Sequence, residues 1–481
     1  MLTNLNFLNT GEPWAPECET DRLKTYDKNR ELFLGEHAKP GGVYDEQFKR
    51  LNNGLEQLGR APVNYIVVLN YFKLTSVRTA DLAFSEPPQI TVADNDAEGE
   101  AKQKAIDYII NKTMLYKRGH TATIDCDRYA DTVLSLSSDE RGLSVDITPP
   151  KFYFAVADPE SIIKITHHVF AWQREVDKDR RLYHLHIQIH DVNNPGWVDD
   201  RVHALDSLEN KQTIGELISR DVLETGFDFC PVFRVSNLET SDSVYGVDSY
   251  NDIDSVIAEL EVRIAQINRI LDKHADPTMA GPRNAIEEDS SGKSYVPIGN
   301  YFGLNEGERL PEYITWEARL EANFKLLDIL LQQLYTLSEM GSALLGDFSQ
   351  KTGQVPSGSA LRRLMMSPLA KARRIASNFD PVLKNLVCAA ASTQNTVIEP
   401  EEITIRWNDG LPQDDAEMAN IMSVRTGGKS TISQFSAIRR MDGATDEDAQ
   451  AELDEIRKDD MSTYPLDLAG DINDPATGAI T

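Results

Sequence analysis

The sequence predicts an α+β protein that is mainly helical. Three observations predict it. Two long segments with heptad-spaced apolar residues flank a Pro- and Gly-rich insert at 277–311. A run of short strands and turns occupies 132–235, and a polar Gly-rich loop at 346–358 precedes a basic helical segment. The 481 residues suffice for roughly two or three hydrophobic cores, so we expect several domains around a central helical hairpin.

Residues 1–125 are predicted to be mostly helical, with helical or apolar segments at 21–34, 64–84 and 97–115. The pattern then changes to strands. Runs of β-branched and aromatic residues bounded by turn residues predict strands at 132–136, 143–147, 152–156, 167–174, 182–190 and 232–235. Asp-Glu-Arg-Gly at 139–142 and Asn-Asn-Pro-Gly at 193–196 have the composition of the turns between them.

The hairpin is predicted from two apolar stripes. The first helix, expected from 246 to about 275, has apolar residues at alternating spacings of four and three: Ile253, Ile257, Leu260, Ile264, Ile267 and Leu271. Pro277 ends it, because proline lacks the backbone N–H. The return helix, expected from about 313 to 346, repeats the spacing with Leu320, Phe324, Leu327, Leu331 and Leu334. Its additional Leu326, Ile329, Leu330 and Leu337 indicate that this helix is covered on more than one side.

The C-terminal third begins with the loop at 346–358 and a long helix from 359 to about 392. Ser357 or Ser359 can cap the start of this helix, and Pro368 and Pro381 are expected to kink or interrupt it. A strand at 403–407 follows. The remainder to about residue 460 is predicted to be helical and acidic, and the last twenty residues to be disordered.

The net charge is the most unusual feature of the composition. The 77 acidic and 49 basic residues give a formal net charge of −28. This argues against a protein that grips nucleic acid over its whole surface, since phosphate binding needs cations. It is compatible with a channel along which DNA slides without sticking. Basic residues concentrate in one segment, 359–384, which contains six bases and a single acid. A polyanion or an acidic neighbouring subunit is therefore expected to contact this segment.

Cysteine usage and hydropathy indicate a protein of the reducing cytosol. The four cysteines are scattered without a CxxC pair, and the polar N-terminus does not resemble a signal peptide. The longest strongly apolar stretch, 65–72, is far short of the roughly 20 residues of a membrane span.

Two patterns could indicate chemistry, and both have simpler interpretations. The segment 426–431 (Thr-Gly-Gly-Lys-Ser-Thr) resembles a phosphate loop, but Ser423 stands where the motif needs glycine, and a helix N-cap at Ser430 or Thr431 explains it better. His184, His186 and His190 share one face of a predicted strand and could bind zinc, yet an exposed polar strand face has the same pattern. We therefore predict no enzyme, no metal site and no cofactor.

Several short segments, in their order along the chain, resemble the portal proteins of tailed bacteriophages, of the siphophage type. They are RELFLGEH at 30–37, GVDSY at 246–250, ILDKHADP at 270–277, VPSGSALR at 355–362, DGLP at 409–412 and the helical tail at 430–460. Each is weak alone, and their common order over most of the chain carries the resemblance.

The resemblance implies a portal fold. Residues 1–245 would form the wing, helical at first and then β-rich. Residues 246–276 and 312–345 would be the two stem helices, with 277–311 as the clip between them. The tunnel loop would be 346–358, followed by the long kinked helix and the returning wing strand at 359–408. Residues 409–460 would be the crown and 461–481 a disordered tail.

The resemblance also implies a function. Portal proteins form a twelve-subunit ring at a capsid vertex, a channel through which viral double-stranded DNA is packaged and ejected. The partners would be other copies of the chain, the large terminase ATPase, the head–tail connector or adaptor, and the major capsid and scaffolding proteins. The location would be the virion, reached from the host cytoplasm during assembly, with no membrane association.

Candidate contact residues follow from this assignment and from charge. Those of the tunnel loop are Phe348, Ser349, Gln350, Lys351, Thr352 and Gln354. Those of the stem and basic helix are Arg263, Arg269, Lys273, Lys325, Arg362, Arg363, Lys371, Arg373 and Arg374. Those of the clip, for partner docking, are Arg283, Lys293 and Tyr295. Two alternative functions remain open, a cytosolic coiled-coil scaffold without a channel and a metallohydrolase that uses the histidines.

Overall fold

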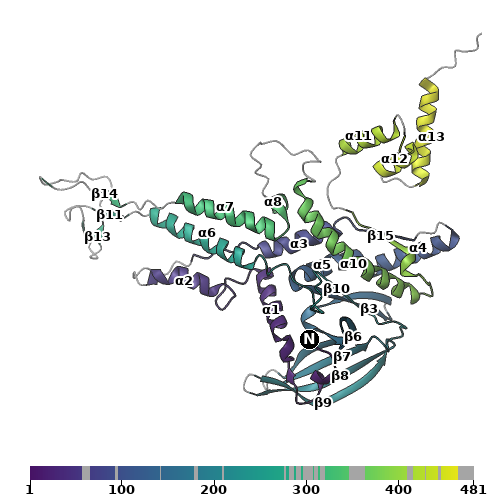
Figure 1. Ribbon diagram of the computed structural model, residues 1–481. Helices are drawn as coiled ribbons and strands as arrows, with labels where there is room; N and C mark the ends of the chain where they lie inside the picture. The colour runs from purple at the N-terminus through teal and green to yellow at the C-terminus, as the bar shows by residue number, and fades with distance from the viewer. Residues whose placement is uncertain are drawn as a thin grey trace, which may run out of the picture. The chain divides into compact units, whose positions relative to one another are not determined.

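A computed structural model describes residues 1–56, 65–92, 96–140, 142–177, 182–208, 211–275, 278–280, 287–288, 294–295, 307, 312–314, 320–345, 363–408, 415–427, 430–442 and 446–463. The fold is α+β, about half helical (Figure 1). The chain divides into two compact units, one of residues 1–353 and 364–410 and one of residues 354–363 and 411–481.

The N-terminal part of the larger unit is helical, as predicted. Its helices are α1 (Thr20–Leu34), α2 (Asp45–Glu56), α3 (Tyr71–Phe84), α4 (Ala97–Thr113) and α5 (Leu115–Tyr129), preceded by the short turns η1 (Asn6–Leu8) and η2 (Glu17–Glu19). Side chains cap two of them: Asn70 accepts a hydrogen bond from the Lys73 N–H, and Asp96 from the Gly99 N–H. Gly35 ends α1 in the left-handed conformation at φ 71°, which glycine adopts without strain.

A six-stranded antiparallel sheet has the order β1-β9-β8-β7-β6-β5. Its strands are β1 (Pro13–Trp14), β5 (Tyr153–Asp158), β6 (Ser161–Asp177), β7 (Leu182–Asp191), β8 (Trp197–Leu208) and β9 (Lys211–Glu224). The predicted strands at 152–156, 167–174 and 182–190 correspond to β5, β6 and β7. The two strands β8 and β9 were not predicted. In β8, charged residues at 199–201 break the apolar alternation. In β9, residues 216–224 are exposed.

Two smaller sheets complete the body. The first has the order β10-β3-β4, from Val232–Ser236, Asp131–Asp139 and Gly142–Thr148, and the turn η3 (Pro150–Phe152) leads from it to β5. In the second, β2 (Gln89–Val92) pairs antiparallel with β15 (Ile403–Arg406), which follows the turn η5 (Pro400–Glu402). The predicted C-terminal strand thus returns to the N-terminal part of the chain, over 300 residues earlier.

The central hairpin consists of α6 (Asp254–Ala275) and α7 (Leu320–Leu337), followed by α8 (Gly341–Leu344) (Figure 1). Between them, β11 (Thr278–Ala280) pairs with β14 (Glu312–Ile314), and β12 (Glu287–Glu288) with β13 (Ser294–Tyr295). The predicted helix starts at 246 and 313 were wrong. The Asp248 carboxylate accepts hydrogen bonds from the N–H groups of Tyr250 and Asn251, which forms a turn, and Tyr313 lies on β14.

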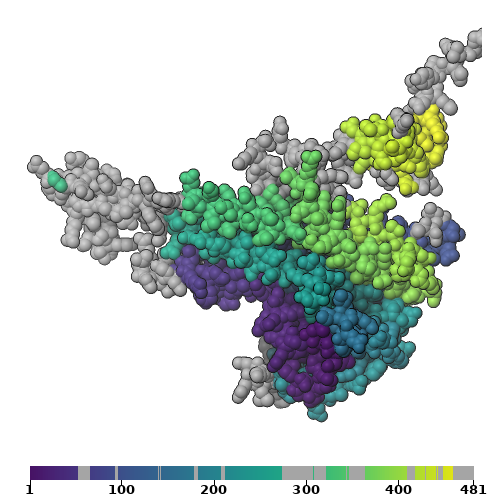
Figure 2. Space-filling model, in the orientation of Figure 1, coloured from purple at the N-terminus to yellow at the C-terminus, as the bar shows by residue number. Residues whose placement is uncertain are grey.

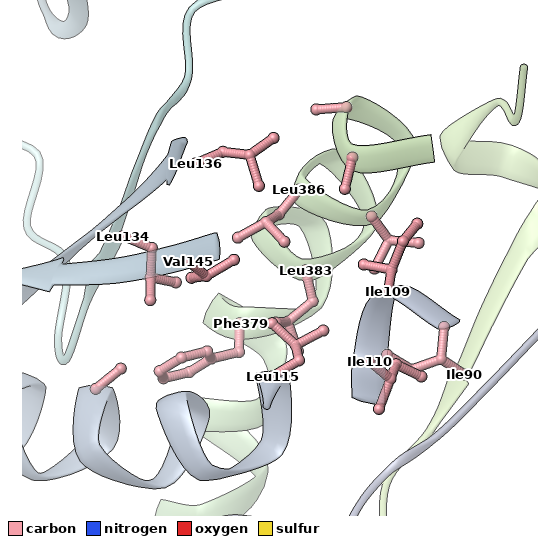
Figure 3. Close-up of a cluster of buried hydrophobic side chains, with 14 of the residues drawn as sticks. Ile90, Ile109, Ile110, Leu115, Leu134, Leu136, Val145, Phe379, Leu383 and Leu386 are labelled. Atoms are coloured by element: carbon pink, nitrogen blue, oxygen red, sulfur yellow. The ribbon is translucent and has the colours of Figure 1, made fainter. Parts of the chain in front are cut away.

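The long helix α10 (Met366–Ser392) lies in the centre of the largest hydrophobic core. Phe379, Leu383 and Leu386 pack there against residues of α4, α5, β3 and β4 (Figure 3). Neither proline interrupts this helix. Pro368 lies in the first turn, where the missing N–H would have no helical partner, and the helix continues through Pro381. The proposed capping residues Ser357 and Ser359 lie outside the described residues.

The smaller unit contains α11 (Asp415–Thr426), α12 (Gln434–Asp442) and α13 (Asp446–Thr463). The helical prediction for this part agrees, but the N-cap of α12 is Ser433, whose hydroxyl accepts a hydrogen bond from the Ser436 N–H. The predicted caps were wrong: Ser430 donates to the Thr426 carbonyl, and the Thr431 N–H to the Arg425 carbonyl, so both close the end of α11. Residues 461–463 of the predicted disordered tail belong to α13, and the rest of that tail lies outside the described residues.

Candidate nucleic-acid interface

The heptad stripe of α6 is buried within the chain. Ile253, directly before α6, and Ile257 and Leu260 on it are fully buried. The first two belong to a core with Phe72 of α3 and Leu334 of α7. Farther along α6 the stripe becomes accessible at Leu271, which is 46% exposed. The base of the hairpin is therefore held by the helices of the body.

A buried polar pair fixes the register of α6 on the body. The Nε2 atom of His37 lies 3.0 Å from Oε2 and 3.1 Å from Oε1 of Glu261, and both side chains are fully buried. The same carboxylate accepts a hydrogen bond of 2.7 Å from the Leu69 N–H. Because a buried carboxylate is stable only when its oxygens are satisfied, these contacts specify one position for the helix.

Three of the predicted stem bases have described side chains. Arg263 bonds to Glu259 and Gln266 on its own helix, and Arg269 donates to the Leu51 carbonyl at 2.6 Å. Both are therefore partly committed to contacts within the chain. Lys325 on α7 is exposed. Lys273 lies on α6, and the structure does not describe its side chain.

Within the basic helix, Lys371 is not accessible for the predicted contact with a polyanion or an acidic neighbouring subunit. Its side chain is 2% exposed, and its ammonium lies 2.9 Å from the fully buried Asp127 carboxylate of α5. That carboxylate also accepts hydrogen bonds from Ser76 of α3 and from Ser249. The network joins α3, α5 and the segment before α6 to the beginning of α10, so Lys371 stabilises the packing of these elements against one another.

The other bases of this helix lie nearer the surface. Arg374 pairs with Glu339, which follows α7. Arg363 and Arg373 are exposed. Arg362 lies outside the described residues.

The tunnel-loop candidates Phe348, Ser349, Gln350, Lys351, Thr352 and Gln354, and the clip candidates Arg283 and Lys293, also lie outside the described residues. Tyr295 is on β13, and the structure does not describe its side chain. These assignments stay predictions.

Two of the histidines of β7, His186 and His190, pack against aromatic rings. His186 stacks on Trp172 with ring centroids 5.6 Å apart, and His190 meets Phe170 edge-on. His168, opposite His190 in the sheet, accepts a hydrogen bond from the Tyr153 hydroxyl at 2.8 Å in the tautomer that leaves Nδ1 unprotonated. Burial, with the nearby His190 and Arg234, lowers the pKa of His168 to about 3. In the described part of the chain, no group of three or more His, Cys, Asp or Glu side chains could hold a metal ion.

Sequence reasoning missed the buried pairs Lys371–Asp127 and His37–Glu261. A signal for the first was available. Lys371 lies four and eight residues before Ile375 and Phe379, and therefore on the apolar face of its helix. A lysine at such a position needs a buried acid, but the sequence alone does not say which one. No comparable signal marked His37.

A helical hairpin that is anchored on an α+β body and continues into the paired strands β11 and β14 is the arrangement expected of a portal protein. The family described as "Phage portal protein, SPP1 Gp6-like" matches residues 14–463. The chain belongs to this family of phage portal proteins, which are structural virion proteins and not enzymes, and the resemblance seen in the sequence is confirmed. Within the described residues, no helix is long and apolar enough to cross a membrane.

Solved structures of gene transfer agent (GTA) particles are also similar. A chain of the neck of an empty particle computed with C6 symmetry has 10% identity and a TM-score of 0.46, over 77% of this chain and 88% of that chain. The neck of a native particle computed with C12 symmetry gives the same identity and TM-score, over 77% and 89%. A chain of the virion of the native particle has 10% identity and a TM-score of 0.45, over 90% and 96%. A search of curated proteins found no match.

Proposed function

We propose that the chain assembles into a twelve-subunit ring at a capsid vertex and forms the channel through which viral DNA is packaged and ejected. The observation that carries this proposal is the α6–α7 hairpin, whose base is fixed by the buried Glu261–His37 pair and whose helices lead into the paired strands β11 and β14. Family membership favours this function over a coiled-coil scaffold or a metallohydrolase. Closed rings in negative-stain micrographs of the purified protein would support it, and a protein that stays monomeric at every concentration would contradict it.

In this proposal residues 1–245, completed by β15, form the wing, and α6 and α7 form the stem. The insert 277–311 is the clip that docks the terminase ATPase and later the head–tail connector. The loop 346–358 projects toward the bore, and the helices α11 to α13 form the crown. Capsid and scaffolding proteins would contact the outside of the ring.

The charge of the chain suits a channel that does not retain its substrate. With a net charge of −28, a predominantly acidic wall repels phosphates, so DNA does not lodge in it. Isolated bases would keep the duplex centred. Lys325, Arg363 and Arg373 are the best candidates among the described side chains because they are exposed, whereas Arg263 and Arg269 are engaged within the chain. Lys351 is the candidate in the loop.

Deletion of residues 348–354 tests the channel assignment. We expect rings to form normally, because the core residues of α10 begin beyond the loop, while DNA packaging or retention falls. The measurements are ring counts by microscopy and the amount of nuclease-protected DNA per particle. A matched control replaces the same seven residues by a Gly/Ser sequence of equal length, which separates loop chemistry from loop length. Normal packaging by both variants would contradict the tunnel-loop assignment.

Exchange of residues 277–311 for a flexible linker tests the clip. We expect rings to persist and binding of the purified terminase ATPase to fall. Binding is measured by co-sedimentation with rings of each variant. Undiminished binding would show that the clip is placed wrongly.

A further inference from the structure

One edge of the six-stranded sheet is open. The outermost long strand, β9, is covered on its outer side only at its beginning, where β1 and the residues before it bond to residues 212–214. From residue 216 to residue 224, in the described part of the chain, β9 pairs with β8 alone (Figure 1). A strand in this position presents unpaired N–H and C=O groups, which can pair with the backbone of another chain.

The open edge is also apolar. Trp197 of β8, opposite the last residue of β9, is 45% exposed. Four aliphatic side chains of β9 are between 43% and 58% exposed: Leu217, Ile218, Val222 and Leu223. Teal atoms of the sheet lie at the surface of the larger unit, along its lower margin in the space-filling view (Figure 2). Residues 216–224 contain neither proline nor lysine, two residue types that commonly protect a free edge from pairing. Such an apolar edge indicates a surface that another chain covers.

The charges along this edge are not balanced. Its one base, Arg220, donates hydrogen bonds of 3.0 and 2.9 Å to the Asp199 carboxylate of β8. Among the described residues, no cation pairs with Glu216, Asp221 or Glu224, and all three are exposed. The edge therefore offers free carboxylates to an incoming chain.

One of these carboxylates also faces a second acid. Asp221 lies directly opposite Asp200 of β8, and like charges in that position repel each other. Burial and the Asp221 carboxylate together raise the pKa of Asp200, although the nearby His186 acts against them. A cation placed beside Asp221 by an added strand would offset this repulsion.

A second copy of the chain does not supply this cation by pairing strands. The other open edge of the same sheet, among the described residues, is residues 171–177 of β6, because β5 pairs with β6 only as far as Phe170. That edge carries Glu175 and Asp177 against the single base Arg174, so its charge is negative as well. Two β9 edges would repel each other for the same reason. The β9 edge therefore suits a basic strand of a different protein.

We propose that residues 219–224 of β9 form a docking site for an extended, basic segment of another protein, which adds a strand to the sheet. Over these residues the register with β8 is unbroken, so the added strand meets a regular edge. On one face of the sheet it places an apolar side chain beside Leu223 and a lysine or arginine beside Asp221. On the other face the same two residue types lie beside Val222 and Glu224. The inference does not use the proposed ring.

A labelled synthetic peptide tests this site on the full-length protein. Its core, Lys-Ile-Val-Lys-Thr-Thr between Gly-Ser ends, opposes residues 224 to 219 one by one in an antiparallel register, and the reversed core tests the parallel one. Binding is measured by fluorescence anisotropy. We expect the variant Asp221→Lys with Glu224→Lys to bind at least about tenfold more weakly, because two attractive cross-strand pairs become repulsive. A peptide with glutamate in place of both lysines should restore binding to this variant.

Two controls make the result specific to strand addition. Glu160→Lys with Glu175→Lys makes the same change of net charge at exposed positions on the opposite side of the sheet, and should bind the peptide as the wild type does. Methylation of alternate peptide nitrogens removes hydrogen-bond donors and leaves the side chains unchanged. One alternate set faces β9 and should abolish binding when methylated, whereas the other faces solvent and should not. Both charge variants change exposed residues, so their Tm should equal that of the wild type.

The outcomes separate this inference from the proposed function. The docking site would be overturned if neither peptide orientation binds the wild type at millimolar concentration, if both charge variants bind equally, or if both methylated sets act alike. Hydrogen exchange of the wild type tests for a second copy. If the outward-facing amides of residues 219–224 are already protected in rings of the pure protein, a neighbouring copy covers the edge and the proposal is wrong. Ring formation itself is tested separately, by microscopy of the same protein.

Discussion

Replacing Lys371 with methionine is expected to lower the free energy of unfolding by about 3–5 kcal/mol, because the Asp127 carboxylate is then left buried without its cation. Asp127 is fully buried and Lys371 is 2% exposed, so water cannot replace the lost partner. Ser76 and Ser249 still donate hydrogen bonds to the carboxylate but carry no charge. The measurement is urea denaturation of the full-length variant followed by far-UV circular dichroism.

Two further variants make this result specific to the ion pair. Arg373→Met changes an exposed base two residues away and should shift stability by no more than about 0.5 kcal/mol. The double variant Asp127→Asn with Lys371→Met removes the lone charge and should recover much of the loss. A loss below about 1 kcal/mol in Lys371→Met would contradict the buried pair.

Acidification from pH 7.5 to pH 5 is expected to destabilise the six-stranded sheet by about 2 kcal/mol for each of two buried histidines. Burial lowers the pKa of His190 to about 4, and burial together with neighbouring positive groups lowers that of His168 to about 3. Below pH 6.5 the unfolded chain takes up protons on these residues and the folded chain does not. The free energy of unfolding therefore decreases as the pH is lowered, until the pH reaches the folded-state pKa values of the two histidines.

His168→Gln isolates the effect of one histidine, and its amide oxygen can still accept from the Tyr153 hydroxyl. We expect this variant to lose about 2 kcal/mol less than the wild type between pH 7.5 and 5, in denaturant titrations at each pH. Burial raises the pKa of Asp131, which titrates with the opposite sign, so the slopes of variant and wild type are compared directly. Val176→Gln, an exposed non-titrating change on β6, is the control. Identical slopes in His168→Gln and wild type would refute the assignment.

The hairpin and most strands could be predicted because their signals are local. Heptad spacing marks α6 and α7, and runs of β-branched and aromatic residues bounded by turn residues mark β5, β6 and β7. The missed strands β8 and β9 lack this signal: Asp199, Asp200 and Arg201 interrupt the alternation, and neighbouring strands supply the hydrogen bonds that hold them. The predicted starts of the two hairpin helices were wrong because other hydrogen bonds compete with the helix there. These are the bonds to the Asp248 carboxylate before α6 and those of the β11–β14 pair before α7.

The candidate interface was predictable only in its outline. Charge counts locate bases along the chain but do not tell an exposed cation such as Arg373 from a buried one such as Lys371, and the helical spacing that places Lys371 on the apolar face does not identify its partner. Their difference depends on Asp127, which is 244 residues from Lys371, and on the packing of α5 against its neighbours. The contacts of Arg269 with the Leu51 carbonyl and of Arg374 with Glu339 likewise join residues far apart in the chain.

By itself, the sequence determined the family, the order of the elements and the overall acidity of this portal protein. Composition, periodicity and short segments in a common order are properties of the linear chain. Only the tertiary structure decided which charged groups are buried and which edge of the six-stranded sheet remains open. The physical reason is that burial and ion pairing depend on contacts between residues far apart in sequence, which spacing along one helix does not specify.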